Sequence, residues 1–205
     1  MTQLKNYNGH YLDPNYLNTS NIVLIDGGAC IGKFVDAVLT ELKIKTIFCL
    51  EPGAQNFQDL LEKYKDRNDV ICINEALVGE GSPKESIYYD YRLPTARYQE
   101  WGGIKGLYLD KRQLISKYPV KTTTLSVLLK KYSIDFIDYL KMDVEGCESE
   151  IIATLTEYTA SKIGQLSMEV HNNDAESLII NLQKFGFTTI LKPGELYAIN
   201  ENRFK

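Results

Sequence analysis

Apolar residues fall into short continuous runs that alternate with amphipathic stretches. The run from Ile22 to Asp26 is continuous and apolar, and a glycine-rich turn follows it. Continuous apolar runs of this length are typical of strands that are buried on both faces of a parallel sheet. Residues 33–43 and 54–66 repeat apolar positions at helical spacing, and residues 46–51 and 70–77 are typical of two further strands. This order of strands and helices predicts an open α/β sheet with right-handed crossovers.

The alternation pauses over residues 79–121, which hold one strand-like segment and a polar loop with several glycines. It then resumes as helix 124–132, strand 136–146, helix 147–158, strand 165–171, helix 175–186 and a hairpin of 188–192 with 195–200. We therefore predict a single domain over residues 1–205, with residues 1–20 as a polar N-terminal arm and residues 79–121 as an insertion.

Composition and charge narrow the class of partner. The chain has 205 residues, 44% of them hydrophobic, and a net charge of −4 from 27 acidic and 23 basic side chains. These values indicate a globular protein with one ordinary core. The basic pairs Lys111-Arg112 and Lys130-Lys131 are isolated among acids, whereas phosphate binding needs a basic stripe. We expect no nucleic-acid partner.

The four cysteines form no CxxC pair and no zinc-like spacing, which favours a reducing compartment. The first residues lack the apolar segment of a signal peptide, and no stretch has the roughly 20 apolar residues that span a bilayer. We expect a cytoplasmic protein with no membrane partner. The oligomeric state stays open.

The turn after residue 26 carries the strongest chemical signal. Glycines there allow close approach to a ligand, but Gly27, Gly28 and Gly32 do not fit the GxGxxG spacing of dinucleotide sites. Asp26 stands directly before them, where a carboxylate repels a pyrophosphate and attracts a cation. S-adenosylmethionine has a net positive charge, so this sign favours it over NAD.

Two further acids end the next two predicted strands. Glu51 has the place of an acid that binds the ribose hydroxyls of an adenosine ligand. Glu75 could accept the adenine amino group while the backbone amide of Ala76 meets the ring. Asp26, Glu51 and Glu75 would then form one arc of adenosyl size. The alternative is that each is a solvated strand end.

Several motifs together resemble the FkbM-type S-adenosylmethionine-dependent methyltransferases. They are IDGGACIGKF, LEPGAQNFQDLLEKY, NEALVG, TTTLSVLL, FIDYLKMDVEGCESEII and SMEVH, in that order from about residue 22 to 190. The most specific is KMDVEG followed by Glu148. The resemblance implies a Rossmann-like class I methyltransferase fold: an α/β, mostly parallel seven-stranded sheet with helices on both faces and a C-terminal antiparallel hairpin.

The resemblance implies transfer of a methyl group from S-adenosylmethionine to a hydroxyl of a sugar, glycan or small natural product. The insertion would form part of the acceptor site, since it carries six tyrosines and Trp101, whose faces suit amphipathic acceptors. The donor-binding residues that we predict are Asp26, Gly27, Gly28, Ala29, Gly32, Glu51, Pro52, Glu75, Ala76 and Asp143.

Removing a proton from an alcohol needs a general base or a metal. The candidates at the strand ends are Lys141, Asp143, Glu145 and His171. We assign His171 to the base, because an imidazole titrates near neutrality, and Asp143 to positioning. We expect no resident metal; the alternative is a hard divalent cation held by Asp143, Glu145, His171 and Asn172.

Two other functions remain open. An NAD-binding oxidoreductase would share the sheet, although the acid before the glycines disfavours it. A non-catalytic adenosyl-binding module would bind the donor without turnover.

Overall fold

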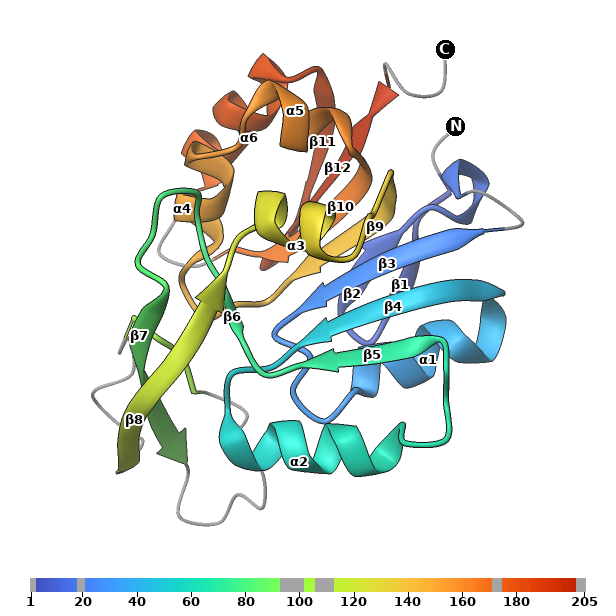
Figure 1. Cartoon of the computed structure of the whole chain (residues 1–205). Coiled ribbons are helices and arrows are strands. Elements are labelled where there is room, and N and C mark those ends of the chain that lie inside the picture. Colours follow the sequence, from blue (N-terminus) through green and yellow to red (C-terminus); the bar gives the residue numbers. More distant parts are fainter. Residues whose placement is uncertain (1–2, 18–20, 93–101, 106–112, 171–174, 202–205) are drawn as a thin grey trace.

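The computed structural model describes residues 3–17, 21–92, 102–105, 113–170 and 175–201 (Figure 1). Its main feature is a seven-stranded sheet in the order β11-β12-β10-β9-β3-β4-β5. In chain order these strands are β3 (Ile22–Gly27), β4 (Ile44–Leu50), β5 (Val70–Ile73), β9 (Ile137–Met142), β10 (Ile163–Glu169), β11 (Phe187–Lys192) and β12 (Glu195–Asn200). β12 runs antiparallel to both of its neighbours, β10 and β11, and the other neighbouring pairs are parallel. The predicted mostly parallel sheet with a terminal hairpin is confirmed.

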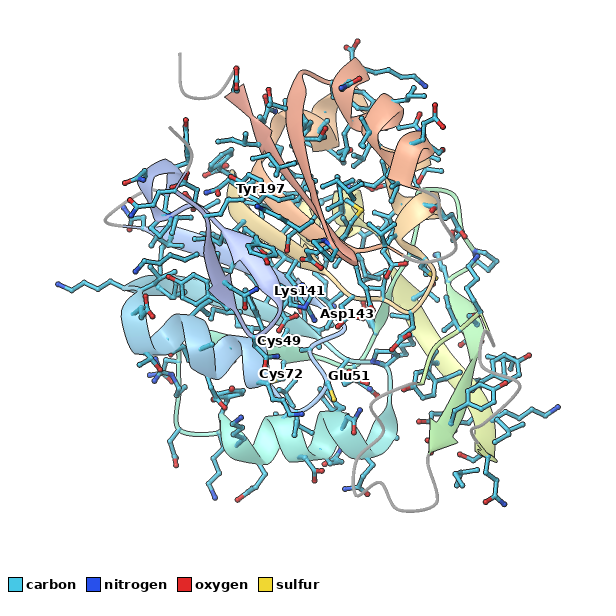
Figure 2. All side chains as sticks on the ribbon, turned by 180° about the vertical axis from the view of Figure 1, so that it is seen from behind. Cys49, Glu51, Cys72, Lys141, Asp143 and Tyr197 are labelled. Carbon is cyan, nitrogen blue, oxygen red and sulfur yellow. The ribbon has the colours of Figure 1, made fainter. Side chains whose placement is uncertain are left out.

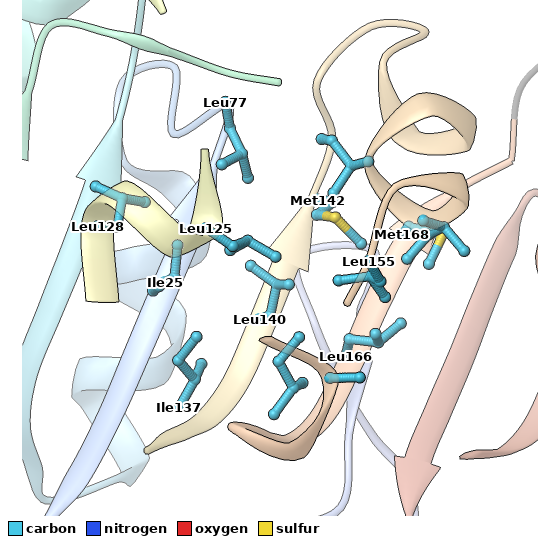
Figure 3. Close-up of a cluster of buried hydrophobic side chains, with 14 of the residues drawn as sticks. Ile25, Leu77, Leu125, Leu128, Ile137, Leu140, Met142, Leu155, Leu166 and Met168 are labelled. Carbon is cyan, nitrogen blue, oxygen red and sulfur yellow. The ribbon is translucent and has the colours of Figure 1, made fainter. Parts of the chain in front are cut away.

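Helices cover both faces of this sheet. They are α1 (Lys33–Glu41), α2 (Ala54–Lys63), α3 (Leu125–Lys131), α4 (Glu148–Ala153), α5 (Glu157–Ser161) and α6 (Ala175–Lys184). Successive strand residues face opposite sides, so Leu24 packs with α1 and α2 whereas Ile25 packs with α3. Figure 3 shows the second of these cores, in which Leu125, Leu140 and Leu166 are labelled. Burial on both faces explains why the strands are continuous apolar runs.

Two predicted elements are divided in the structure. The predicted helix 147–158 is two helices, because α4 ends at Ala153 and Thr156 begins α5 with a capping box to Thr159. The predicted strand 70–77 leaves the main sheet after Ile73, and its last two residues form β6 (Ala76–Leu77) of a second sheet. The apolar pattern continues across each break, so it does not reveal either one.

The N-terminal arm is structured rather than a loose polar segment. β1 (Lys5–Tyr7) and β2 (His10–Leu12) form a hairpin, followed by a 3-10 turn, Pro14–Tyr16. The hairpin packs against β10 and β12 with Leu12 fully buried. Asp13 is anchored by two hydrogen bonds: its amide donates to the Gln165 side chain (2.9 Å), whose amide donates to the Asp13 carbonyl (3.1 Å). The arm is therefore part of the core.

The insertion supplies most of a second sheet, in the order β6-β8-β7. Its long strands, β7 (Glu85–Arg92) and β8 (Gln113–Thr123), pair antiparallel, and β6 pairs parallel with the end of β8. In Figure 1 this sheet stands beyond the carboxyl ends of β3, β4 and β5. None of the helices in the described part of the chain is long and apolar enough to cross a membrane.

Candidate active site

A cavity lies where the carboxyl ends of β3, β4 and β9 face the second sheet. It encloses about 540 Å³ of space not filled by protein atoms, part of it open to solvent. Its lining residues are Gly28, Cys30, Glu51, Pro52, Ala76, Leu77, Tyr88, Gly102, Gly103, Ile104, Asp143, Val144 and Glu145. Ligands of open α/β sheets bind at this edge, where the strand order reverses.

The turn after β3 brings the backbone close to the neighbouring strand end. Gly28 has a φ of +76°, and a β-carbon there would lie 1.9 Å from the backbone oxygen of Asp143. Only glycine fits both conditions. The amides of Gly28 and Ala29 both donate to the carbonyl of Leu50, at 3.0 and 2.9 Å, which ties the turn to β4. Gly32 instead begins α1 and packs against Tyr64, which is not a lining residue.

Asp26 lies beneath the turn and not in the cavity. Its carboxylate is fully buried and pairs with the buried ammonium of Lys141 at 3.0 Å. Lys141 also donates to the carbonyl of Gly28 at 2.8 Å. Burial lowers the pKa of Lys141, but the carboxylates of Asp26 and Asp143 raise it by a larger amount, so its pKa lies above the ordinary value. A lysine held protonated in this way cannot accept a proton, which makes Lys141 unsuited to the role of general base.

Glu51 has no such cation within ion-pair distance in the described residues. Its two carboxylate oxygens accept hydrogen bonds from the amides of Gly53 (2.7 Å) and Cys30 (2.8 Å). Burial raises its pKa to about 7, because these amides and the more distant Lys141 only partly offset the loss of solvent. Cys30 has a φ of +49°, which aims its amide at Glu51. The carboxylate is held in place at the cavity and titrates near neutrality.

Asp143 and Glu145 both line the cavity because β9 ends at Met142, so the alternation of a strand no longer separates them. Glu145 has a φ of +54°, which turns the chain, and Glu148 holds the turn by accepting from the amides of Val144 (2.8 Å) and Gly146 (2.9 Å). Burial by itself raises the pKa of Asp143, but Lys141 and His10 lower it well below the usual range. Figure 2 shows Lys141 and Asp143 side by side.

Tyr88 of the second sheet and the glycine pair Gly102-Gly103, which pairs with β7 through an isolated bridge, line the cavity opposite the strand ends. Tyr88 is buried and packs against Tyr118, with ring centroids 5.4 Å apart. A β-carbon on Gly102 would lie 1.9 Å from the Tyr88 hydroxyl, and one on Gly103 would lie 2.9 Å from the β-carbon of Glu145. The double glycine therefore lets this segment pass between the tyrosine and the turn after β9.

The structure brings together only part of the predicted site. Six predicted residues line the cavity: Gly28, Glu51, Pro52, Ala76, Asp143 and Glu145. Five predicted donor contacts and one predicted base do not: Asp26, Gly27, Ala29, Gly32, Glu75 and Lys141. The Glu75 carboxylate lies 3.4 Å from the ammonium of Lys131, because the chain leaves the main sheet at Ile73 before reaching it. Of the three acids in the predicted arc, only Glu51 lines the cavity. His171 and Trp101 lie outside the described residues.

Three features of the site were missed in the sequence. Tyr88 was counted only among the six tyrosines of the insertion, and no pattern in the sequence separates it, as a lining residue, from Tyr89 and Tyr91. The Gly102-Gly103 pair could have indicated a close approach. His10, placed by sequence in a polar arm, lies 3.7 Å from Asp143, and no local pattern signals a contact across 133 residues.

Within the described ranges, no group of three or more histidine, cysteine or acidic side chains could hold a metal ion. His171 and Asn172 of the alternative cation site lie outside the described residues.

Residues 26–188 match the model of the FkbM methyltransferase domain. Among solved structures, the FkbM methyltransferase from Methylobacillus flagellatus KT superimposes with a TM-score of 0.56 at 18% identity, covering 87% of this chain and 43% of that one. This chain therefore spans less than half the length of that protein. An rRNA methylase from Streptococcus thermophilus gives a TM-score of 0.52 at 10% identity, covering 91% and 90%. No protein with a curated description matches. The family model spans most of the sequence, and the chain belongs to the FkbM methyltransferase family.

Proposed function

We propose that this protein transfers a methyl group from S-adenosylmethionine to a hydroxyl of a sugar, glycan or small natural product. The observation that carries the proposal is the acidic cavity at the strand ends of a chain of the FkbM family. Its charged lining residues in the described part of the chain are Glu51, Asp143 and Glu145, with no lysine, arginine or histidine. A cationic donor fits this charge, whereas the pyrophosphate of NAD does not.

The negative charge of the cavity does not come from Asp26, on which the sequence argument for a cationic donor rested. Lys141 neutralises Asp26 below the turn, so Asp26 contributes little field at the cavity. Asp143 remains ionised, because its pKa is lowered, and its side chain is about one third exposed. We assign Asp143 to the ammonium end of the donor and Glu51 to the ribose hydroxyls, for which its fixed oxygens are suited.

When bound, S-adenosylmethionine supplies an electrophilic methyl group on a sulfonium. The protein must then hold the acceptor oxygen in line with that methyl and remove its proton. Asp143 is a weak base because its pKa is lowered, and Lys141 is kept protonated. Glu145 and His171 remain the candidate bases, and we retain His171. Val170, the residue before His171, follows the end of β10, and its backbone amide donates a hydrogen bond to the carbonyl of Gly194.

Calorimetric titration with S-adenosylhomocysteine and with NAD tests the donor. We expect micromolar binding of S-adenosylhomocysteine and none of NAD. Tight NAD binding would overturn the proposal in favour of an oxidoreductase.

Transfer of labelled methyl groups tests the acceptor. Sugars and hydroxylated natural products should be labelled, whereas ribosomal RNA should not be. Labelling of RNA alone would identify a different acceptor class, and donor binding without transfer to any acceptor, including cell extract, would indicate a binding module. Turnover should survive EDTA; loss that magnesium or manganese restores would make Asp143 and Glu145 candidate metal ligands.

The general base is tested by His171→Ala. Turnover should fall by about 10²–10⁴, the range for loss of a general base, while donor affinity is unchanged. Near-full turnover in this variant would move the assignment to Glu145, and Glu145→Gln should then cause the loss.

A further inference from the structure

His10 is a buried histidine that the proposed reaction does not use. Its Nδ1 lies 2.8 Å from Oε1 of Glu195, and its Nε2 lies 3.7 Å from Oδ2 of Asp143. Both partners accept hydrogen bonds when ionised, and a neutral imidazole has only one N–H. Only the imidazolium can present a hydrogen to each. The ring edge also packs against Phe34, which fixes its plane.

The two cations nearest Asp143 approach the same oxygen. Lys141 Nζ lies 3.6 Å from Oδ2, and His10 Nε2 lies 3.7 Å from that same atom. A side-chain hydrogen bond with Glu169, at the end of β10, also lowers the pKa of Asp143. Because both His10 and Lys141 contact Oδ2, they fix the orientation in which the Asp143 carboxylate meets the cavity.

The charged groups around His10 come from three elements. They are Asp143 and Lys141 from β9 and its exit turn, and Glu195 from β12. Burial lowers the pKa of His10, but the two carboxylates outweigh it, and the net shift is upward from 6.5. The hairpin that carries His10 has separate anchors in Leu12 and in the Asp13–Gln165 hydrogen bonds. A change at His10 should therefore leave the hairpin in place.

We propose that His10 is a positioning residue of the donor site: as an imidazolium between Glu195 and Asp143 it holds, with Lys141, Oδ2 of Asp143 and leaves Oδ1 to meet the donor's ammonium. This rests on the proposed function. When the imidazolium loses its proton, one carboxylate loses its donor, and Asp143 is free to rotate toward Glu169. Donor affinity should then decline as pH rises through the pKa of His10.

Titration with S-adenosylhomocysteine between pH 6 and 8.5 tests this for the unaltered protein, His10→Gln and Tyr11→Phe. Tyr11 lies on the same strand and is the control. We expect His10→Gln to bind about tenfold more weakly at pH 7, as for one lost bond to a charged group, and to lack the decline at alkaline pH. Protonation of the ligand and of Glu51 changes with pH in the same way for all three proteins, so its effect cancels when their affinities are compared.

Glu195→Gln provides a second test that does not alter His10. Removing this carboxylate should lower the pKa of His10 and move the alkaline decline by about one pH unit toward acid. NMR can follow the His10 ring directly, since His171 is the only other histidine. An alkaline decline that persists in His10→Gln, or does not move in Glu195→Gln, would overturn the inference. Absence of binding by the unaltered protein at every pH would instead overturn the proposed function.

Discussion

Two acids stand at neighbouring strand ends, each directly before a glycine-containing turn, and the fold treats them differently. Asp26, the fifth residue of β3, is fully buried and paired with Lys141 at 3.0 Å. Glu51, just after β4, is also buried but is held by two backbone amides and lines the cavity. The first is paired with a buried cation beneath the turn and has a structural place. Burial raises the pKa of the second to about 7, because the two backbone amides offset it only in part, and its carboxylate lines the cavity.

The largest expected effect comes from breaking the first arrangement. Lys141→Met leaves Asp26 buried with an uncompensated charge, which should lower the free energy of unfolding by about 3–5 kcal/mol. Chemical denaturation at pH 7 measures it. The double variant Asp26→Leu/Lys141→Met removes both charges and should recover part of the loss. A cost below about 1 kcal/mol for Lys141→Met would mean that water reaches Asp26.

Gly28→Ala tests the turn after β3, which lies between the buried Asp26 and the cavity. A left-handed φ and a β-carbon 1.9 Å from the Asp143 oxygen should together lower the free energy of unfolding by about 2–4 kcal/mol. Gly81→Ala is the matched control, since Gly81 has a φ of +84° with nothing within 4 Å, and it should cost about 1–2 kcal/mol. Equal costs for the two variants would refute the close approach.

The raised pKa of Glu51 in the folded state predicts how the free energy of unfolding depends on pH. Because the folded pKa of Glu51 lies above its unfolded value of 4.5, the folded state binds more protons between these values, and stability should fall by about 2–3 kcal/mol as pH rises from 5 to 8. His10, with its pKa raised above 6.5, acts in the same direction at the upper end of this range. Groups with lowered pKa, such as Asp143, act only below this range.

Thermal unfolding without ligand measures this dependence, and Glu51→Gln should flatten most of it. Stability that rises from pH 5 to 8 would contradict the burial of Glu51.

The smallest effect separates Glu51 from the third acid. Glu51→Gln should weaken binding of S-adenosylhomocysteine by about 1.5–3 kcal/mol, through loss of a hydrogen bond to a charged group. Glu75→Gln should leave binding unchanged, because that carboxylate lies against Lys131 outside the cavity. A comparable loss in Glu75→Gln would restore the adenine contact that its sequence position suggested, and no loss in Glu51→Gln would make Glu51 a structural residue.

The order of strands and helices, the buried parallel sheet and the place of the site at its carboxyl edge all follow from the sequence. They depend on local periodicity and on the turn residues, which each segment carries in itself. The resemblance of the KMDVEG region to a family was equally local, and the family model confirms it.

Only the tertiary structure decided which acid faces the cavity. Asp26 and Lys141 are 115 residues apart, and their pairing depends on β3 and β9 lying side by side in register. The end of β5 at Ile73 turns Glu75 away, although the apolar run continues to Leu77. His10 reaches Asp143 because the hairpin packs against β10 and β12. Periodicity reports which face of an element is buried, but charge pairing depends on distances between elements that no local pattern contains.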